Sequence, residues 1–300
     1  MKILNRNINL NTKPFIIAEM SGNHSKSLNT ALNIVEAASK SGADAIKLQT
    51  FSLKEMTLNI RNKNFIIRDK NSLWKGRDLF KLYNEIHTPW EWHPKIIKKA
   101  NEVGLFCFSS VFDEKSLDFL ESLNTPAYKI ASFENNHYPL IEKVAKTKKP
   151  VIISTGFATY KELDEITKIL KKNNNSNYAF LKCTSSYPAN PKDTNLLAIP
   201  KMIKKYKCTV GLSDHTLGIA VAIASISLGS RIIEKHIKIS KNDESIDSKF
   251  SLDPIEFKQM TYGILTAWKS LGSNFLGISN NEKKTKQFRR SIYVTKNIKK

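Results

Sequence analysis

Two histidines that follow neighbouring strand-like segments are the side chains best suited to chemistry in this sequence. His215 comes after the apolar run 208–212, and His236 closes the run 231–236. The stretch 217–229 between them is rich in Ala and Ile and has the length of a helix. Strand, helix and strand make a βαβ unit, which places both imidazoles at one edge of a parallel sheet. Two imidazoles there can supply half the shell of a divalent metal ion; the alternative is two unrelated, hydrogen-bonded histidines.

Polar side chains also lie at the ends of nearly all other strand-like segments, which favours a functional edge over a chance pair. They are Glu19, Lys47, Gln49, Ser110, Lys129, Ser132, Glu134, Ser154, Ser185, Tyr187 and Ser213. Lys47 and Lys129 alternate with apolar residues, so both point inward. A single inward lysine is often a structural ion-pair partner, but two with a ring of hydroxyls indicate an anion site. We therefore predict a small, multiply anionic ligand whose phosphate or carboxylate neutralises the lysines beside the metal.

The elements that position these residues alternate regularly. Eight strand-like segments are separated by helical ones, at residues 15–19, 43–49, 105–109, 127–131, 151–154, 178–184, 208–212 and 231–236. Helix starts are predicted at Thr88 before Pro89, at Asp113, and at the capping box of Thr159 and Glu162. This order predicts an α/β fold, a (β/α)8 TIM barrel, because an open doubly wound sheet would carry a glycine-rich loop that the segment 21–24 lacks.

The connection from Thr50 to His87 is unusually long for a link between strand and helix. Long connections of this kind lie over the active face of a barrel. We expect a lid or a substrate-shaping element; the alternative is a helical excursion that only covers a barrel edge.

Composition limits the class of protein. Three hundred residues with 41% hydrophobic content suffice for one barrel-sized domain. No apolar run approaches the ~20 residues of a membrane span, and the start of the chain lacks a signal-peptide core. The net charge of +21 is spread over helix surfaces without a nucleic-acid-binding motif. Together with three cysteines in no redox spacing, this predicts a cytoplasmic protein with neither a nucleic acid nor a membrane as partner.

Several segments, in order along the chain, resemble the sialic acid synthase family. They are Ile17-Ala18-Glu19, Gly42-Ala43-Asp44-Ala45-Ile46-Lys47-Leu48-Gln49, Tyr128-Lys129-Ile130-Ala131-Ser132, Gly211-Leu212-Ser213-Asp214-His215-Thr216-Leu217-Gly218, Ile233-Glu234-Lys235-His236 and Phe288-Arg289-Arg290-Ser291. Within that family the chain most resembles the pseudaminic acid synthases. That likeness is carried by Leu73-Trp74-Lys75-Gly76-Arg77, His87-Thr88-Pro89-Trp90-Glu91-Trp92-His93, Ser132-Phe133-Glu134-Asn135 and Asp247-Ser248-Lys249-Phe250-Ser251-Leu252.

The resemblance implies a transferase that condenses phosphoenolpyruvate with an amino-sugar aldehyde, forming a nonulosonic acid and phosphate. The implied sugar is 2,4-diacetamido-2,4,6-trideoxy-L-altrose and the product pseudaminic acid; N-acetylneuraminate and legionaminic acid are alternatives. His215 and His236 would bind Mn²⁺ or Mg²⁺, and Glu19 and Glu134 would transfer protons or orient water. Phosphoenolpyruvate would be held by Lys47, Ser110, Lys129, Ser132, Ser154, Ser185 and Ser213. The sugar would contact Gln49, Tyr187 and Asp247.

The family pattern also implies a domain organisation. Residues 1–280 are expected to form the synthase barrel, and residues 281–300 resemble only the first strand of the antifreeze-like (SAF) domain that follows it. In the family that domain swaps onto a partner and contributes to the sugar site. We therefore expect a homodimer, weakened if that domain is absent, with poor affinity for the sugar.

Two other classes of function stay open from the sequence. A barrel aldolase would use a lysine, such as Lys129, to form a Schiff base, which borohydride would trap. A sugar-binding protein, or a chain of low activity, would bind ligands without efficient phosphate release.

Overall fold

The computed structural model describes residues 1–60, 62–70 and 72–299. Eight parallel strands close into a barrel in the order β10-β3-β4-β5-β6-β7-β8-β9. The strands are β3 (Phe15–Glu19), β4 (Ala45–Thr50), β5 (Phe106–Val111), β6 (Tyr128–Ile130), β7 (Val151–Ser154), β8 (Tyr178–Cys183), β9 (Thr209–Asp214) and β10 (Ile232–His236). The predicted (β/α)8 barrel is confirmed, and β3 and β7 have the predicted bounds.

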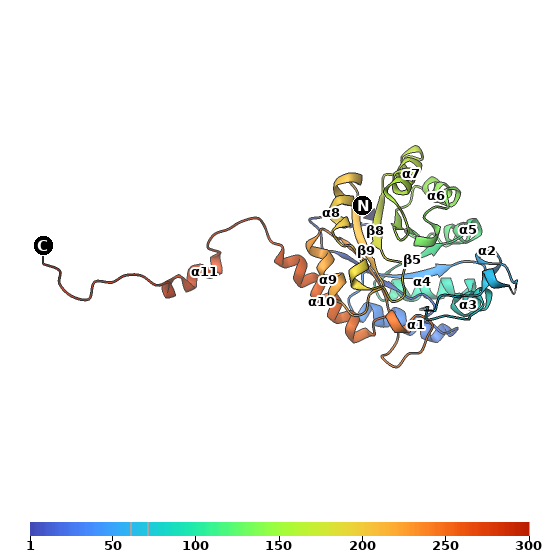
Figure 1. Ribbon diagram of the computed structural model, residues 1–300, viewed down its shortest axis with the longest axis horizontal. Coiled ribbons are helices and arrows are strands. Elements are labelled where there is room, and N and C mark those ends of the chain that lie inside the picture. The colour runs from blue at the N-terminus through green and yellow to red at the C-terminus, as the bar shows by residue number, and fades with distance from the viewer. Residues whose placement is uncertain (61, 71, 300) are drawn as a thin grey trace. The chain divides into compact units, whose positions relative to one another are not determined.

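Helices surround the barrel (Figure 1). They are α1 (Leu28–Lys40), α4 (His93–Glu102), α5 (Glu114–Ser122), α6 (Tyr138–Lys146), α7 (Tyr160–Lys172), α8 (Ala198–Tyr206), α9 (Ala220–Ser227) and α10 (Pro254–Ser270). The side chain of Asp113 caps α5 and that of Thr159 caps α7, as predicted. The predicted helix start at Thr88 is wrong. The short 3-10 helix η2 (Trp90–Trp92) begins after Pro89 without a side-chain cap. The Thr88 hydroxyl is engaged elsewhere, in a hydrogen bond with His24 Nε2 at 3.1 Å.

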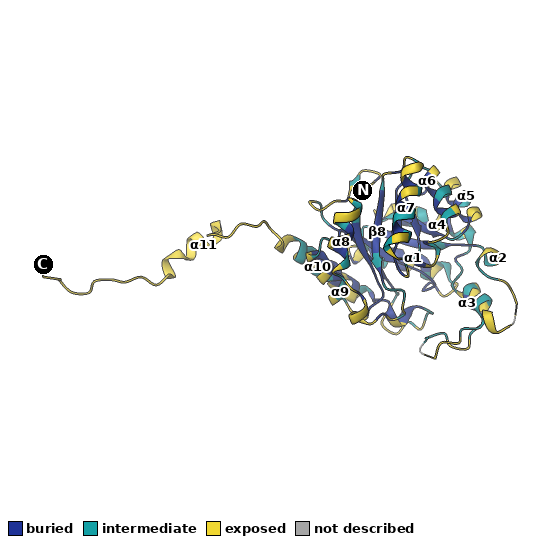
Figure 2. Cartoon of the chain, turned by 45° about the horizontal axis from the view of Figure 1, so that its top comes forward, coloured by how far each residue is buried: buried dark blue, intermediate teal, exposed yellow. Residues whose placement is uncertain are grey.

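Apolar residues alternate along each strand between two separate cores. Outward residues such as Ile46 and Tyr128 pack against the helices. Inward residues such as Phe15 and Ile152 fill the interior, where they meet Ile3 and Ile8. Ile3 belongs to a small antiparallel sheet of β1 (Lys2–Ile3) and β2 (Arg6–Asn7), and Ile8 directly follows β2. The barrel is therefore solid at this end, and its strands are buried while the helices turn exposed faces to solvent (Figure 2).

The long connection between β4 and α4 has little regular structure of its own. It contains α2 (Leu53–Met56), the 3-10 helix η1 (Lys63–Phe65) and α3 (Leu79–Ile86); residues 61 and 71 lie outside the described part. Further 3-10 helices follow the strands β6, β8 and β10: η3 (Ser132–Glu134), η4 (Pro191–Asp193) and η5 (Ser248–Phe250).

The chain divides into two compact units, Met1–Ser270 and Leu271–Lys300. The first is the barrel. The second contains α11 (Asn280–Thr285) and the 3-10 helix η6 (Lys286–Phe288). Among the described residues, no helix combines the length and apolar character needed to cross a membrane.

Candidate active site

The carboxyl ends of the barrel strands surround a cavity of about 570 Å³. All fourteen side chains predicted to form the site line it, including those from the connections that follow the strands. They are Glu19, Lys47, Gln49, Ser110, Lys129, Ser132, Glu134, Ser154, Ser185, Tyr187, Ser213, His215, His236 and Asp247. The strand register explains much of this convergence: Glu19 pairs with Lys47, and Ser110 with Lys129, as lateral neighbours on adjacent strands.

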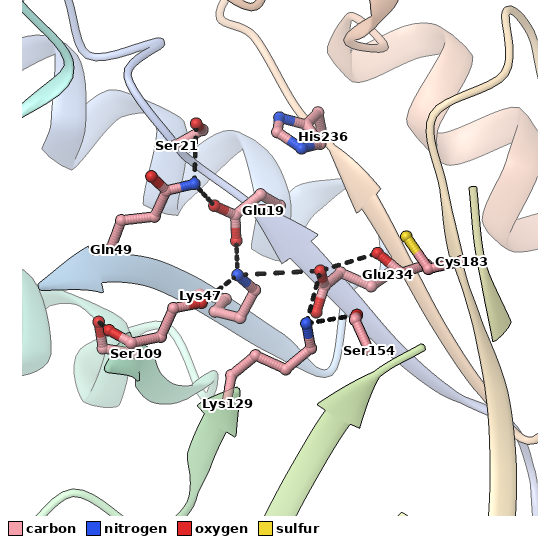
Figure 3. A network of polar contacts seen from close by, with 12 residues as sticks. Glu19, Ser21, Lys47, Gln49, Ser109, Lys129, Ser154, Cys183, Glu234 and His236 are labelled. Atoms are coloured by element: carbon pink, nitrogen blue, oxygen red, sulfur yellow. Dashed lines mark hydrogen bonds and ion pairs between the residues drawn. The ribbon is translucent and has the colours of Figure 1, made fainter. Parts of the chain in front are cut away.

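A cluster of buried charges forms the floor of the cavity (Figure 3). Lys47 Nζ lies 2.5 Å from Glu19 Oε2 and 3.8 Å from Glu234 Oε1. Lys129 Nζ lies 3.6 Å from the same Glu234 oxygen. The lysines also donate to serines, Lys47 to Ser110 at 2.8 Å and Lys129 to Ser154 at 2.6 Å. Both ammonium groups are therefore held in fixed positions facing the cavity.

Glu234 was not among the predicted site residues, and its position corrects the argument about charge. The sequence predicts that a ligand neutralises the lysines, whereas Glu19 and Glu234 already supply two carboxylates. Glu234 alternates with Lys235 on β10 and so shares the inward face of His236. The alternation that oriented Lys47 and Lys129 would have identified it. Burial disfavours its ionised form, but the two lysines outweigh burial and lower the pKa of Glu234.

Serine hydroxyls converge beside the lysines, and a glycine makes room for them. A Cβ atom on Gly156 would lie 2.1 Å from Ser185 Oγ and 2.6 Å from Ser132 Oγ, so a larger residue would displace both hydroxyls. Ser132 Oγ accepts from the Gly156 amide at 3.2 Å. Ser213 completes the group by donating to Glu234 at 3.1 Å. Hydroxyls and ammonium groups at this density suit a small anion.

His215 and His236 face each other with their ring centroids 5.4 Å apart. His215 Nδ1 lies 3.0 Å from the Thr184 carbonyl oxygen, to which it donates, so the lone pair of Nε2 can be turned to a metal ion. His236 Nδ1 is buried without a hydrogen-bond partner among the described residues, and Asp247 Oδ2 lies 3.9 Å from it. Burial and the nearby cationic groups hold the pKa of His236 well below its usual range, which keeps it neutral.

This arrangement fits a weakly held divalent ion. Two facing imidazoles with a carboxylate nearby are suitable donors for an exchangeable metal. No group of three His, Cys, Asp or Glu side chains in the described part of the chain meets closely enough to bind one alone. Water or substrate oxygens would have to complete the shell.

The polar side chains near Glu19 form a second network. Gln49 Nε2 donates to Glu19 Oε1 at 2.9 Å and to Ser21 Oγ at 3.1 Å, and the Ser21 hydroxyl donates to Asp247. Ser21 was not predicted, because it lies in a loop that no pattern orients. The network offers carboxylate and amide groups to the hydroxyls of a ligand.

Glu134 differs from the carboxylates of the floor in having no ion pair with any residue that the structure describes. One of its oxygens, Oε2, is buried without a hydrogen-bond partner among the described residues. Burial raises the pKa of Glu134 to about 7, although Lys129 opposes the shift. A carboxyl group with this pKa exchanges protons readily at neutral pH.

Cys183 is a further cavity residue that the sequence did not single out for the site. Its sulfur lies 3.9 Å from His215 Nδ1. Burial alone would raise the pKa of the Cys183 thiol, but His215 and Lys129 lower it to about 7. All three cysteines, Cys107, Cys183 and Cys208, are free.

The long β4–α4 connection forms a largely apolar wall of the cavity. It contributes Met56, Ile67, Trp74, Leu79, Leu82, Tyr83 and Ile86, and also the polar Asp69 and Ser72. This favours the substrate-shaping alternative over an excursion that only covers a barrel edge. The cavity therefore has a charged floor and a largely apolar wall.

Comparison with known proteins identifies relatives over nearly the whole chain. The protein is 46% identical over 294 residues to "Pseudaminic acid synthase" of Campylobacter jejuni subsp. jejuni serotype O:23/36 (strain 81-176), which covers 98% of this chain and 85% of that protein. It is 41% identical to "Pseudaminic acid synthase" of Helicobacter pylori (strain ATCC 700392 / 26695), over 96% of this chain and 84% of the relative.

A solved structure has the same fold. The N-acetylneuraminic acid (sialic acid) synthetase from Leptospira borgpetersenii serovar Hardjo-bovis, in complex with citrate, superposes with a TM-score of 0.84 at 29% identity. The match covers 96% of this chain and 95% of the other. The family description that matches residues 34–275 is NeuB family. The resemblance inferred from the motifs is confirmed, and the chain belongs to the NeuB family of synthases.

Proposed function

We propose that this protein condenses phosphoenolpyruvate with 2,4-diacetamido-2,4,6-trideoxy-L-altrose to give pseudaminic acid and phosphate. The observation that carries the proposal is the meeting of two inward lysines, a ring of serine hydroxyls and two facing histidines in one cavity. The choice of sugar rests on the 46% identity to a pseudaminic acid synthase.

The anion subsite is assigned to the lysines and serines. Lys47 and Lys129 would pair with the phosphate and carboxylate of phosphoenolpyruvate, because both ammonium groups are buried and aimed at the cavity. Ser110, Ser132, Ser154, Ser185 and Ser213 would donate hydrogen bonds to the same oxygens. Glu19 and Glu234 hold the lysines in place before the ligand arrives.

The sugar is assigned to Gln49 and Asp247 of the neighbouring network and to Tyr187, which lies beside His215. Asp247 lies beside His236, so a sugar bound there presents its aldehyde to the histidine pair. His215 and His236 would hold Mn²⁺ or Mg²⁺, which supplies Lewis-acid polarisation of the aldehyde oxygen when it is bound.

The reaction forms one carbon–carbon bond, and the protons that it takes up and releases must balance. C3 of phosphoenolpyruvate attacks the aldehyde carbon, whose oxygen takes up a proton and becomes a hydroxyl. Water adds to C2 and gives up its two protons, one to the new hydroxyl and one to the departing phosphate, as the bond between C2 and the phosphate oxygen breaks and C2 becomes a carbonyl. Glu134, with a pKa of about 7, is suited to exchange one of these protons, and Glu19 orients Gln49 toward the ligand. Lysine forms no covalent bond in this scheme.

The test is phosphate release measured across amino sugars, with the product identified by mass spectrometry. We expect release only with phosphoenolpyruvate, a divalent metal and sugar together, and fastest with the trideoxy sugar. A faster reaction with the precursor of N-acetylneuraminate or legionaminic acid would overturn the choice of sugar. Binding without phosphate release would support the sugar-binding alternative.

The aldolase alternative is separated by a different experiment. Burial lowers the pKa of Lys129, which is a property that a Schiff-base lysine needs. Borohydride reduction in the presence of a keto acid should nevertheless leave no adduct, because Lys129 is engaged by Ser154 and Glu234. A trapped adduct at Lys129 would contradict the proposed function.

We also propose that the reaction takes place in the cytoplasm, which the three free cysteines support. A homodimer stays a prediction, and sedimentation of the full chain tests it.

A further inference from the structure

Trp74 joins the long β4–α4 connection to the centre of the cavity. Its ring centroid lies 5.7 Å from that of Tyr187, which in turn lies 4.4 Å from His215 and 5.3 Å from Phe250. Phe250 also packs at 4.9 Å against His236. A continuous series of ring contacts therefore runs from Trp74 to both histidines.

A hydrogen bond fixes the other edge of the same side chain. The Trp74 indole N–H donates to the Ile246 carbonyl oxygen at 3.2 Å. Ile246 precedes Asp247, which lies beside His236 and accepts a hydrogen bond from Ser21. The indole thus holds a defined orientation against the loop that carries Asp247.

The surroundings of Trp74 determine what it can recognise. The other cavity residues of the connection are the apolar Met56, Ile67, Leu79, Leu82 and Ile86 together with the polar Asp69, Ser72 and Tyr83. A ligand hydroxyl turned toward the apolar members of this wall would lose water without gaining a hydrogen bond. A methyl group or a C–H face would instead gain dispersion contacts with the rings. The wall therefore favours the apolar parts of a polar ligand.

We propose that Trp74, with Tyr187 beside it, is the specificity-determining wall of the sugar subsite, an inference that rests on the proposed function. It packs against an acetamido methyl group or a deoxygenated carbon of the sugar. The ammonium groups of the floor hold phosphoenolpyruvate independently of this wall. Trp74 thus selects N-acylated deoxy sugars over sugars that carry a hydroxyl at the same position.

The test compares Trp74→Ala with the parent in steady-state phosphate release. Two sugars are used: the trideoxy diacetamido sugar and an N-acetyl amino sugar that keeps its C6 hydroxyl. We expect the KM for the deoxy sugar to rise about 10- to 100-fold, as loss of an apolar contact in a pocket does. The preference for the deoxy sugar should fall by a similar factor. The Kd for phosphoenolpyruvate, measured by calorimetry, should stay unchanged.

Two further variants test whether packing against the Trp74 ring causes the change in sugar KM. Trp74→Phe keeps a ring but loses the N–H, so recovery of most of the sugar affinity supports packing against the wall. Failure to recover would assign the effect to the bond with Ile246 and overturn the wall. Tyr262→Ala removes an aromatic side chain that is 74% exposed on α10, away from the cavity, and should leave all constants unchanged.

The outcomes separate this inference from the proposed function. An active parent whose Trp74→Ala variant keeps the same sugar KM and the same preference overturns the inference alone. A parent that releases no phosphate with any sugar overturns the proposed function and the inference together.

Discussion

The barrel contains two buried charge clusters that differ in how completely their bonds are satisfied. The inward cluster of Glu19, Lys47, Lys129 and Glu234 faces the cavity. The outward cluster pairs Lys235 with Asp214 at 2.8 Å, and neither residue lines the cavity. Consecutive residues Glu234 and Lys235 thus belong to opposite faces of one strand.

The outward pair is closed, in the sense that both Asp214 oxygens and the Lys235 ammonium group have hydrogen-bond partners. Asp214 Oδ1 accepts from the Thr216 amide at 2.9 Å and from the Thr216 hydroxyl at 2.8 Å, while Lys235 also donates to the Thr216 carbonyl. In the inward cluster, Glu234 Oε2 lacks a hydrogen-bond partner among the described residues. A closed cluster can only stabilise the fold. A carboxylate oxygen with bonding capacity left over, next to a cavity, can also accept a hydrogen bond from water or from a ligand hydroxyl. Variants on the two faces should therefore fail in different ways.

The largest effect on turnover is expected at His215 and His236, which line the same cavity as the inward cluster. His215→Ala or His236→Ala should abolish turnover while the thermal midpoint changes little, because each imidazole lies at a strand end and faces the cavity. Activity assays with Mn²⁺ and scanning calorimetry measure the two quantities, and metal-stripped parent is the control. Full activity in either variant, or in the stripped protein, would refute the metal role.

The inward lysines come next. Lys47→Ala or Lys129→Ala should weaken phosphoenolpyruvate binding by about 3–5 kcal/mol, the cost of removing one partner of a desolvated charge pair. Titration calorimetry gives this value directly. Unchanged affinity would contradict the anion subsite. Unfolding of both variants would make the inward cluster as structural as the outward one and would remove the distinction between them.

Replacement of the outward lysine, Lys235, should lower the free energy of unfolding and leave the affinity for phosphoenolpyruvate unchanged. Lys235→Met leaves Asp214 buried without its cation, and the free energy of unfolding should fall by about 3 kcal/mol. The low end of the usual range is expected because Asp214 keeps both bonds to Thr216. Urea denaturation measures the loss. Lys205→Met, which breaks the half-exposed pair with Asp164, is the control and should change little. A Lys235 variant with parental stability but weakened phosphoenolpyruvate binding would reverse the assignment.

The contrast between the two faces also explains what the sequence could predict. Strand alternation is local, so the inward direction of Lys47 and Lys129 followed from their neighbours. The same rule applied to β10 would have oriented Glu234 inward and Lys235 outward. The sharing of Glu234 between two lysines could not be predicted, because it depends on how three strands are staggered around the barrel.

Contacts between loops were beyond pattern analysis for a different reason. The bond from Trp74 to Ile246 joins residues 172 positions apart in two irregular segments. No periodicity orients such side chains, and only the long-range packing of the loops brings them together. Asp247 entered the predicted site through family resemblance alone, and Ser21, its hydrogen-bond donor, was missed.

The smallest effect tests Glu134, a half-buried carboxyl group with no counter-ion among the described residues. Burial raises the pKa of Glu134 to about 7 from an ordinary value near 4.5. Between these values the unfolded chain releases its proton while the folded chain retains it. Folding stability therefore falls as pH rises across this window, and the loss is complete above pH 7. Glu134→Gln abolishes the titration and should be more stable than the parent at pH 8.

The gain should be roughly 1–2 kcal/mol, since one pKa unit corresponds to about 1.4 kcal/mol and partial exposure reduces the effect. At pH 4 the two proteins should be equally stable, because the carboxyl group is then protonated in both states. Urea denaturation at pH 4, 6 and 8 measures the difference, with the surface variant Glu102→Gln as control. Parallel stability curves for Glu134→Gln and the parent would show that Glu134 ionises at no cost to the fold. An unpaired carboxylate kept at such a cost is what a proton-transfer role requires and a structural role does not.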